Sequence, residues 1–167
     1  MHLTPDANLT IAIRGAVQEI RRQDVGDFPE KLSGSYRVDK WSPGTNKTYV
    51  QAVIGLAPED PERPVCERAG TSPCQLAWVL GGIEEPPFNL TNRRFLFVDR
   101  SEPVVGEWVR FEVNPRADFE REWGQVPRDY DRLILYLEVR YEYPSGLPKA
   151  DRPPVEAEVR WDDLYLG

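Results

Sequence analysis

The chain has 167 residues, of which 40% are hydrophobic and 29% charged, and its formal net charge is -7. A length within about 100–200 residues predicts one domain with its own core, spanning 1–167. The acidic balance disfavours nucleic acid as a partner, because binding to phosphates depends on clustered Lys and Arg, and no apolar run approaches the ~20 residues that cross a bilayer.

Short aliphatic and aromatic runs occur along the whole chain, with Pro and Gly between them. This pattern is typical of an all-β protein, an antiparallel two-sheet sandwich. In chain order, we expect strands at 8–14, 16–22, 33–41, 48–56, 75–83, 94–99, 106–113, 131–143 and 155–166. One short helix is expected at 116–123.

Apolar and polar residues alternate in the last three long runs, so each strand has one face for a core and one for water. If 106–113, 131–143 and 155–161 were neighbours in one sheet, their polar faces would combine. The combined patch would hold Trp108, Arg110, Glu112, Tyr136, Glu138, Arg140, Glu142, Glu156, Glu158 and Arg160. Such a patch suits either a polysaccharide or a solvated face tied by exposed Arg–Glu pairs.

Two cysteines, Cys66 and Cys74, lie in a polar connection between two predicted strands. Their spacing is not that of a C-x-x-C redox pair, and no further Cys or internal His could complete a zinc site. We therefore expect a disulfide that closes this connection, and with it an oxidising compartment or a thermophilic source.

The sequence has one histidine, His2, beside the N-terminus. A chain end is a poor place for a catalytic histidine, since a Ser-His-Asp or Cys-His arrangement needs a rigidly held ring. Zinc sites built on several histidines are excluded as well.

The C-terminal third carries a recognisable order of motifs. A strand begins with Gly106, Trp108 and Phe111, a long apolar strand follows, and the chain closes on Asp162 and Asp163. This order resembles the second half of the jelly-roll carbohydrate-binding modules of the galactose-binding-like superfamily, over roughly the last sixty residues. The resemblance implies a jelly roll that binds a polysaccharide or other glycan without catalysis, within a larger secreted or cell-surface protein.

Many of those modules carry a structural calcium, and the resemblance implies Asp162 or Asp163 as a ligand. Calcium prefers six to eight oxygen ligands, including carboxylates. Asp6, Glu19 and Asp24 are the candidate acidic partners nearer the N-terminus. In the alternative interpretation, the two terminal aspartates mark a bulge or strand end with solvated carboxylates.

Aromatic rings can stack on the C–H face of a sugar, and five tryptophans are available. We expect Trp78 and Trp161 in the core, because both lie among apolar residues. Trp41 and Trp123 are the candidates for an exposed platform, with the alternative that each pins its loop to the domain. Trp108 faces away from its apolar neighbours and fits either role.

Three functions remain open at this point. The first is a non-catalytic glycan-binding domain that uses Trp41, Trp123, Trp108, Tyr136, Glu138 and Arg140. The second is a glycoside-active enzyme that pairs Glu138 with Glu112 or Glu156, since two carboxylates suffice for glycoside hydrolysis. The third is an extracellular interaction domain that binds no sugar, because fold alone does not fix function.

Overall fold

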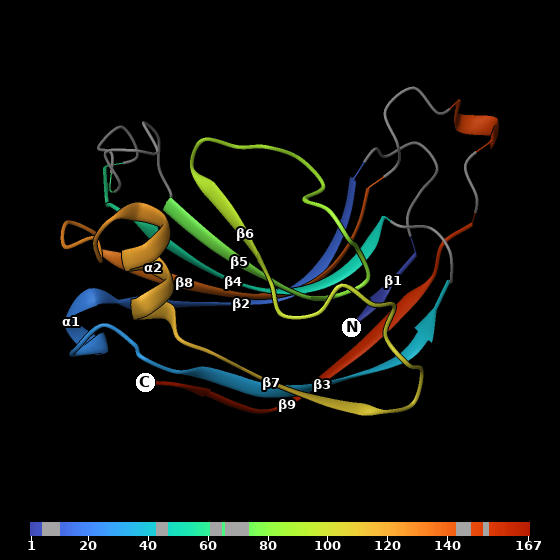
Figure 1. Cartoon of the computed structure of the whole chain (residues 1–167), viewed down its shortest axis with the longest axis horizontal. Coiled ribbons are helices and arrows are strands. Elements are labelled where there is room, and N and C mark those ends of the chain that lie inside the picture. The colour runs from blue at the N-terminus through green and yellow to red at the C-terminus, as the bar shows by residue number, and fades with distance from the viewer. Residues whose placement is uncertain (5–10, 43–46, 61–64, 66–73, 143–147, 152–153) are drawn as a thin grey trace.

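The computed structural model describes residues 1–4, 11–42, 47–60, 65, 74–142, 148–151 and 154–167. In these residues the chain forms two facing sheets, one of four strands and one of five (Figure 1). The four-stranded sheet contains, in spatial order, β1 (His2–Leu3), β9 (Ala157–Leu166), β3 (Leu32–Trp41) and β7 (Trp108–Val113). The five-stranded sheet contains β2 (Ile11–Arg21), β8 (Arg132–Glu142), β4 (Thr48–Ala57), β5 (Cys74–Gly81) and β6 (Arg93–Phe97).

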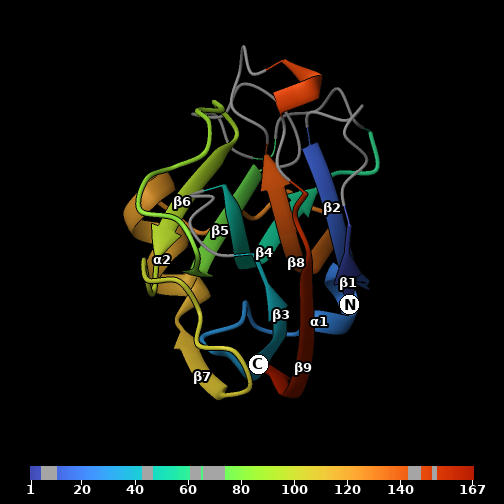
Figure 2. The ribbon, with the colours of Figure 1, turned by 90° about the vertical axis from the view of Figure 1, so that its right-hand side faces the viewer.

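Successive strands lie in opposite sheets except for β4, β5 and β6, which follow one another in the five-stranded sheet, and the orders β1-β9-β3-β7 and β2-β8-β4-β5 are those of a jelly roll. The predicted all-β sandwich is therefore confirmed. Figure 2 shows the five strands of the larger sheet side by side, with β2 and β6 at its edges. One pairing departs from the antiparallel prediction: β6 runs parallel to β5, because the connection between them returns the chain to the same end of the sheet.

Two predicted segments, 8–14 and 16–22, belong to one strand in the described part of the chain, where β2 runs unbroken from Ile11 to Arg21. Gly15 interrupts the pattern in the sequence without ending the strand. A Cβ at this position would lie 2.8 Å from the carbonyl oxygen of Leu137, so the glycine permits a close approach of β2 to β8.

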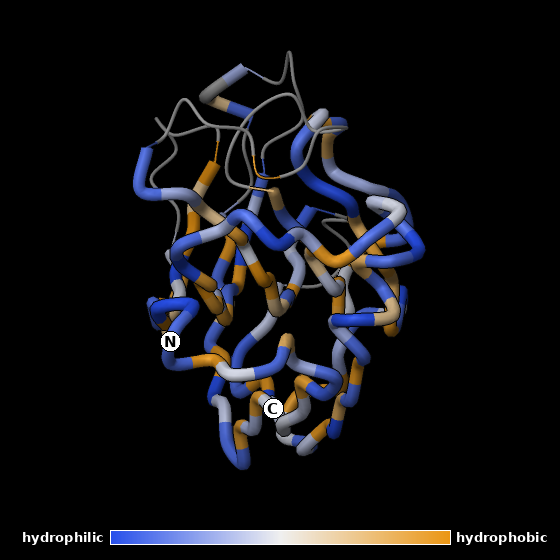
Figure 3. The backbone as a smooth tube through the Cα atoms, turned by 90° about the vertical axis from the view of Figure 1, so that its left-hand side faces the viewer, coloured by the Kyte–Doolittle hydropathy of each residue, from blue (hydrophilic) through white to orange (hydrophobic). Residues whose placement is uncertain are grey.

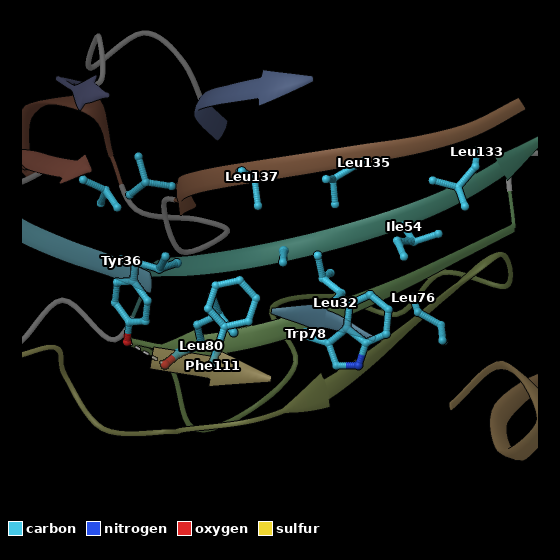
Figure 4. Close-up of a cluster of buried hydrophobic side chains, with 14 of the residues drawn as sticks. Leu32, Tyr36, Ile54, Leu76, Trp78, Leu80, Phe111, Leu133, Leu135 and Leu137 are labelled. Atoms are coloured by element: carbon cyan, nitrogen blue, oxygen red, sulfur yellow. Dashed lines mark hydrogen bonds between the residues drawn. The ribbon is translucent and has the colours of Figure 1, made fainter. Parts of the chain in front are cut away.

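The core lies between the sheets and is built from alternate residues of each strand. Polar and apolar positions alternate along the strands in Figure 3, and the inward apolar side chains meet in Figure 4. Members that are at most 7% exposed include Leu32, Tyr36, Ile54, Leu76, Trp78, Leu80, Phe111, Leu133, Leu135 and Leu137. Trp161 packs beside this core at ring-centroid distances of 5.9 Å from Tyr36 and 6.1 Å from Phe111. The predicted core positions of Trp78 and Trp161 are thus confirmed.

Two α-helices and one 3-10 helix complete the described structure: α1 (Arg22–Val25), α2 (Pro115–Trp123) and η1 (Lys149–Asp151). The side chain of Asn114 caps α2 by accepting a hydrogen bond from the amide of Ala117 at 2.9 Å. The indole of Trp78 donates to Asp118 at 2.7 Å and ties α2 to the five-stranded sheet. None of the described helices is long and apolar enough to span a membrane.

The N-terminus is held in the four-stranded sheet by β1. The amino group of Met1 donates to the carbonyl of Val159 at 2.6 Å, and His2 lies opposite Glu158. His2 is therefore an ordered strand residue, contrary to the expectation of a loose chain end.

A buried tyrosine joins the two sheets. The hydroxyl of Tyr36, on β3, donates to the carbonyl oxygen of Leu80, on β5, at 2.9 Å (Figure 4). Burial, with a smaller contribution from Asp99, raises the pKa of Tyr36 from 10.0 to about 12. The folded protein thus keeps this proton at a pH where an unfolded tyrosine has lost it.

We expect Tyr36→Phe to lower the free energy of unfolding by about 1–2 kcal/mol at neutral pH, because an intersheet hydrogen bond is lost. The difference from the natural chain should shrink as the pH rises from 10.0 toward about 12, since the unfolded state of the natural chain then releases a proton that its folded state retains. Urea unfolding across this range measures both effects. A difference that stays constant with pH would contradict the assigned role of the hydroxyl.

Candidate functional site

The polar patch predicted from three strands does not form. β7 and β9 lie in the four-stranded sheet with β3 between them, whereas β8 lies in the five-stranded sheet. The prediction of one shared face was wrong because alternation fixes the face of each strand but says nothing about which strands are neighbours. Of the six predicted binding residues, Tyr136, Glu138 and Arg140 stay together on the outward face of β8.

Trp108 lies on the outward face of the four-stranded sheet, and it is 46% exposed. The guanidinium carbon of Arg37 lies 5.3 Å from the centroid of its ring. Arg37 also contacts Asp39 at 2.7 Å, and hydrogen bonding to Arg37, with the charges of Arg160 and Arg37, lowers the pKa of Asp39. Ion pairs on a solvated sheet face contribute little to stability. This face matches the predicted alternative of a solvated sheet with ion pairs.

The expectation of an exposed ring was wrong for Trp123. This residue ends α2, is 4% exposed and belongs to the core, together with Phe119 one helical turn earlier. The guanidinium carbon of Arg94 lies 4.3 Å from the centroid of its ring. Trp41, at the end of β3, is half-buried and packs against the same core. Neither indole forms an open platform.

The outward face of the five-stranded sheet has a different character. The sheet curves so that its concave side points away from the four-stranded sheet (Figure 1). The pairing of β4 with β8 sets Gln51 opposite Glu138 and Tyr49 opposite Arg140 on this side. We call the following residues the concave-face cluster: Tyr49, Gln51, Gln75, Arg93, Tyr136, Glu138, Arg140 and Glu142.

Arg140 is the centre of a buried network in this cluster. Its two terminal nitrogens lie 3.9 Å from Glu138 and 3.3 Å from Glu142. Gln51 donates to Glu138 at 2.6 Å, and the hydroxyl of Tyr49 donates to Glu142 at 2.9 Å. The side chain of Arg140 is 7% exposed and those of both glutamates 11%. Buried charges are costly unless paired, so this network holds its members in fixed orientations.

Two atoms of the network lack a hydrogen-bond partner within the described structure. These are Oε1 of Gln51 and Nε of Arg140, and both are buried. An unsatisfied buried polar atom costs about 1–3 kcal/mol, so its presence calls for an explanation beyond stability. The concave face thus holds one buried acceptor and one buried donor that form no hydrogen bond with the described residues.

Aromatic rings and a second guanidinium border this network. Phe88, Arg93 and Tyr136 are all half-buried, so part of each side chain remains accessible. Phe88 lies in the connection between β5 and β6, and the guanidinium carbon of Arg140 is 5.4 Å from the centroid of its ring. Burial raises the pKa of Tyr136. Rings above oriented polar groups suit a ring-shaped polar ligand.

The two terminal aspartates lie at a bulge, as the alternative interpretation predicted. The register between β3 and β9 shifts between Ser33 and Ser35, and Asp163 adopts a left-handed backbone with φ of 52°. The amide of Asp163 donates to the carboxylate of Asp162 at 2.9 Å. Within the described residues, no group of three or more Asp, Glu, His or Cys gathers there.

Two carboxylates fall well short of the six to eight oxygens that calcium prefers. The described residues alone therefore do not form the predicted calcium site. Glu19 and Asp24 lie on β2 and α1, whereas the third candidate partner, Asp6, lies outside the described residues. The predicted disulfide likewise has one partner, Cys66, outside the described residues, while Cys74 is buried at the start of β5. Both assignments stay predictions.

Half of the concave-face cluster was not identified from the sequence. Tyr49, Gln51, Gln75 and Arg93 lie on three other strands. Gln51 and Gln75 were visible as lone polar residues within apolar runs, which is the available signal. No sequence pattern indicated that these runs would flank the strand of Glu138.

No protein-family model matches this chain, and the search of curated proteins gives no significant match.

We expect Gln51→Leu to lower the free energy of unfolding by about 1–3 kcal/mol, because the buried carboxylate of Glu138 loses a donor. The same substitution at Gln18, an exposed residue of β2, should change stability by less than about 0.5 kcal/mol. Urea unfolding of both variants measures the difference. Equal effects at the two positions would show that the network does not constrain the fold.

Proposed function

We propose that this chain is a non-catalytic glycan-binding domain and that it binds through the concave-face cluster. One observation carries the proposal: half-buried aromatic rings border a buried network in which Gln51 and Arg140 each keep one polar atom without a hydrogen-bond partner among the described residues. A sugar ring offers an apolar C–H face and a rim of hydroxyls, which complement such a surface. The resemblance of the C-terminal motifs to jelly-roll carbohydrate-binding modules supports the same function.

The ring of Tyr136 is the best-placed stacking surface for a sugar. Val53 of β4 lies opposite it, and Gly55 is its diagonal neighbour on the same strand, where an added Cβ would lie 3.5 Å from the ring. A larger side chain at Gly55 would therefore cover the edge of the ring. The adjacent Glu138 and Arg140 are charged hydrogen-bonding groups, the strongest partners for hydroxyls, and 7–11% of each side chain is exposed beside the ring.

The enzyme alternative is not supported by the carboxylate pairs expected from the sequence. Glu112 lies on β7 and Glu156 immediately precedes β9, so both belong to the four-stranded layer, opposite that of Glu138. Glu112 contacts Lys31 at 2.6 Å, and Glu156 contacts Lys40 at 2.9 Å. Glycoside hydrolysis needs two carboxylates on either side of one bond, so neither pair fits.

The proposal extends to the setting of the domain. A glycan-binding domain without catalysis acts by holding other activities near a polysaccharide. We therefore propose an extracellular or cell-surface location, with other domains of a larger protein as partners.

Affinity electrophoresis against a panel of neutral and acidic polysaccharides tests this function. We expect retardation by at least one polysaccharide, and Tyr136→Ala should weaken it about tenfold through the loss of stacking. Trp108→Ala removes an exposed indole from the opposite sheet and should leave binding unchanged.

Loss of binding in the Trp108 variant, with binding by Tyr136→Ala unaffected, would show that the binding site lies on the four-stranded sheet and would contradict the proposal. Release of reducing sugar by the natural chain would favour the enzyme alternative. If no polysaccharide of the panel binds, the result would favour the third function, an interaction domain that has no sugar ligand.

A further inference from the structure

The concave face holds two arginines that differ in their ion pairing. Arg140 is compensated by Glu138 and Glu142, as described above. Arg93, on β6, uses its Nε to donate to the neutral side-chain oxygen of Gln75 at 2.6 Å. Within the described structure, Arg93 makes no ion pair, and its terminal nitrogens make no hydrogen bond of their own.

The surroundings of Arg93 desolvate its charge, and no carboxylate of the described residues forms an ion pair with it. The guanidinium carbon lies 5.8 Å from the ring centroids of both Phe88 and Phe95. Burial lowers the pKa of Arg93, the charge of Arg140 lowers it further, and the charge of Glu138 opposes both effects. Both guanidiniums contact Phe88, so two cations share one patch in which only one has carboxylate partners.

We propose that the glycan is acidic and that Arg93 binds a carboxylate of its sugar units. This inference rests on the proposed glycan-binding function and names its substrate class. A guanidinium presents a planar fork of donors that matches a carboxylate and forms charge-assisted hydrogen bonds. Arg93 keeps its terminal donors available, and the neighbouring rings exclude water that would otherwise compete.

The position of Arg93 also agrees with a ligand that lies across the strands. Arg93 is on the edge strand β6, whereas Tyr136 is on β8, with β4 and β5 between them. The backbones of β8 and β6 are three strand spacings apart, about 14 Å. The two side chains approach each other across this distance, since the charge of Arg93 acts on the pKa of Tyr136. A glycan stacked on Tyr136 would therefore lie close to Arg93.

The experiment compares each acidic polysaccharide with its own neutral form. Polygalacturonate, alginate and hyaluronan are used, each alongside a counterpart whose carboxylates have been reduced to alcohols. We expect at least one acidic parent to bind about tenfold more tightly than its reduced form, and Arg93→Gln should abolish this preference. Arg110→Gln, which removes an exposed arginine from the opposite sheet, is the matched control and should retain the preference.

Several outcomes would overturn the inference. If the reduced forms bind as tightly as the acidic parents, the glycan carboxylates do not contribute to binding. The inference then fails, while the proposed glycan-binding function is retained. The far-ultraviolet spectrum and the thermal midpoint show whether Arg93→Gln folds. If the folded variant keeps the preference for the acidic form, a group other than Arg93 binds the carboxylate. If no polysaccharide binds, the inference and the proposed function fail together.

Discussion

The register between β4 and β8 is the constraint on which both the core and the candidate site depend. The pairing sets Ala52 opposite Leu137 in the core and Gln51 opposite Glu138 on the concave face. Because side chains alternate with a period of two, a slip of one residue would exchange the two faces. Apolar residues would then meet the outside, and a charged network would enter the interior. Burial of the leucines of β8 therefore also positions Glu138 and Arg140.

The two outward faces of the sandwich show two ways of carrying charge. On the four-stranded sheet, pairs such as Lys31 with Glu112 are exposed, and each contributes little to stability. On the five-stranded sheet, Arg140 and its glutamates are buried and tied to neighbouring strands. Burial makes each contact sensitive to the loss of a partner, and it fixes the geometry. The concave face therefore carries a rigid and largely buried polar network, and the opposite face of the sandwich is an ordinary solvated one.

Much of the fold could be predicted from alternation and turn residues, because these are local properties. The sandwich, the long strands and the short helix near 116–123 all follow from them. The order of the strands within each sheet could not be predicted, since it depends on contacts between residues that are distant in the sequence. Gly15 shows the limit at short range, because a glycine that permits close strand packing looks the same in sequence as one that ends a strand. The site was therefore predicted on one strand, β8, and missed on the three others.

Trp123 shows the same limit for a single side chain. In sequence it lies among polar residues, which suggested an exposed ring, yet it is 4% exposed. Phe119 and Trp123 are four residues apart and so share one face of α2, which packs on the core. The buried face of a short helix is harder to recognise in a sequence than that of a strand, because only two apolar residues are needed to pack the helix on the core.

The placement of the last two strands has a consequence for how the protein is made. β8 is inserted between β2 and β4, and β9 between β1 and β3, so each sheet receives an interior strand from the C-terminal part of the chain. While the ribosome is still adding residues 132–166, the earlier strands have open edges and uncovered apolar faces. The sandwich must therefore close after translation has passed β9, and a nascent chain needs protection from association until that moment.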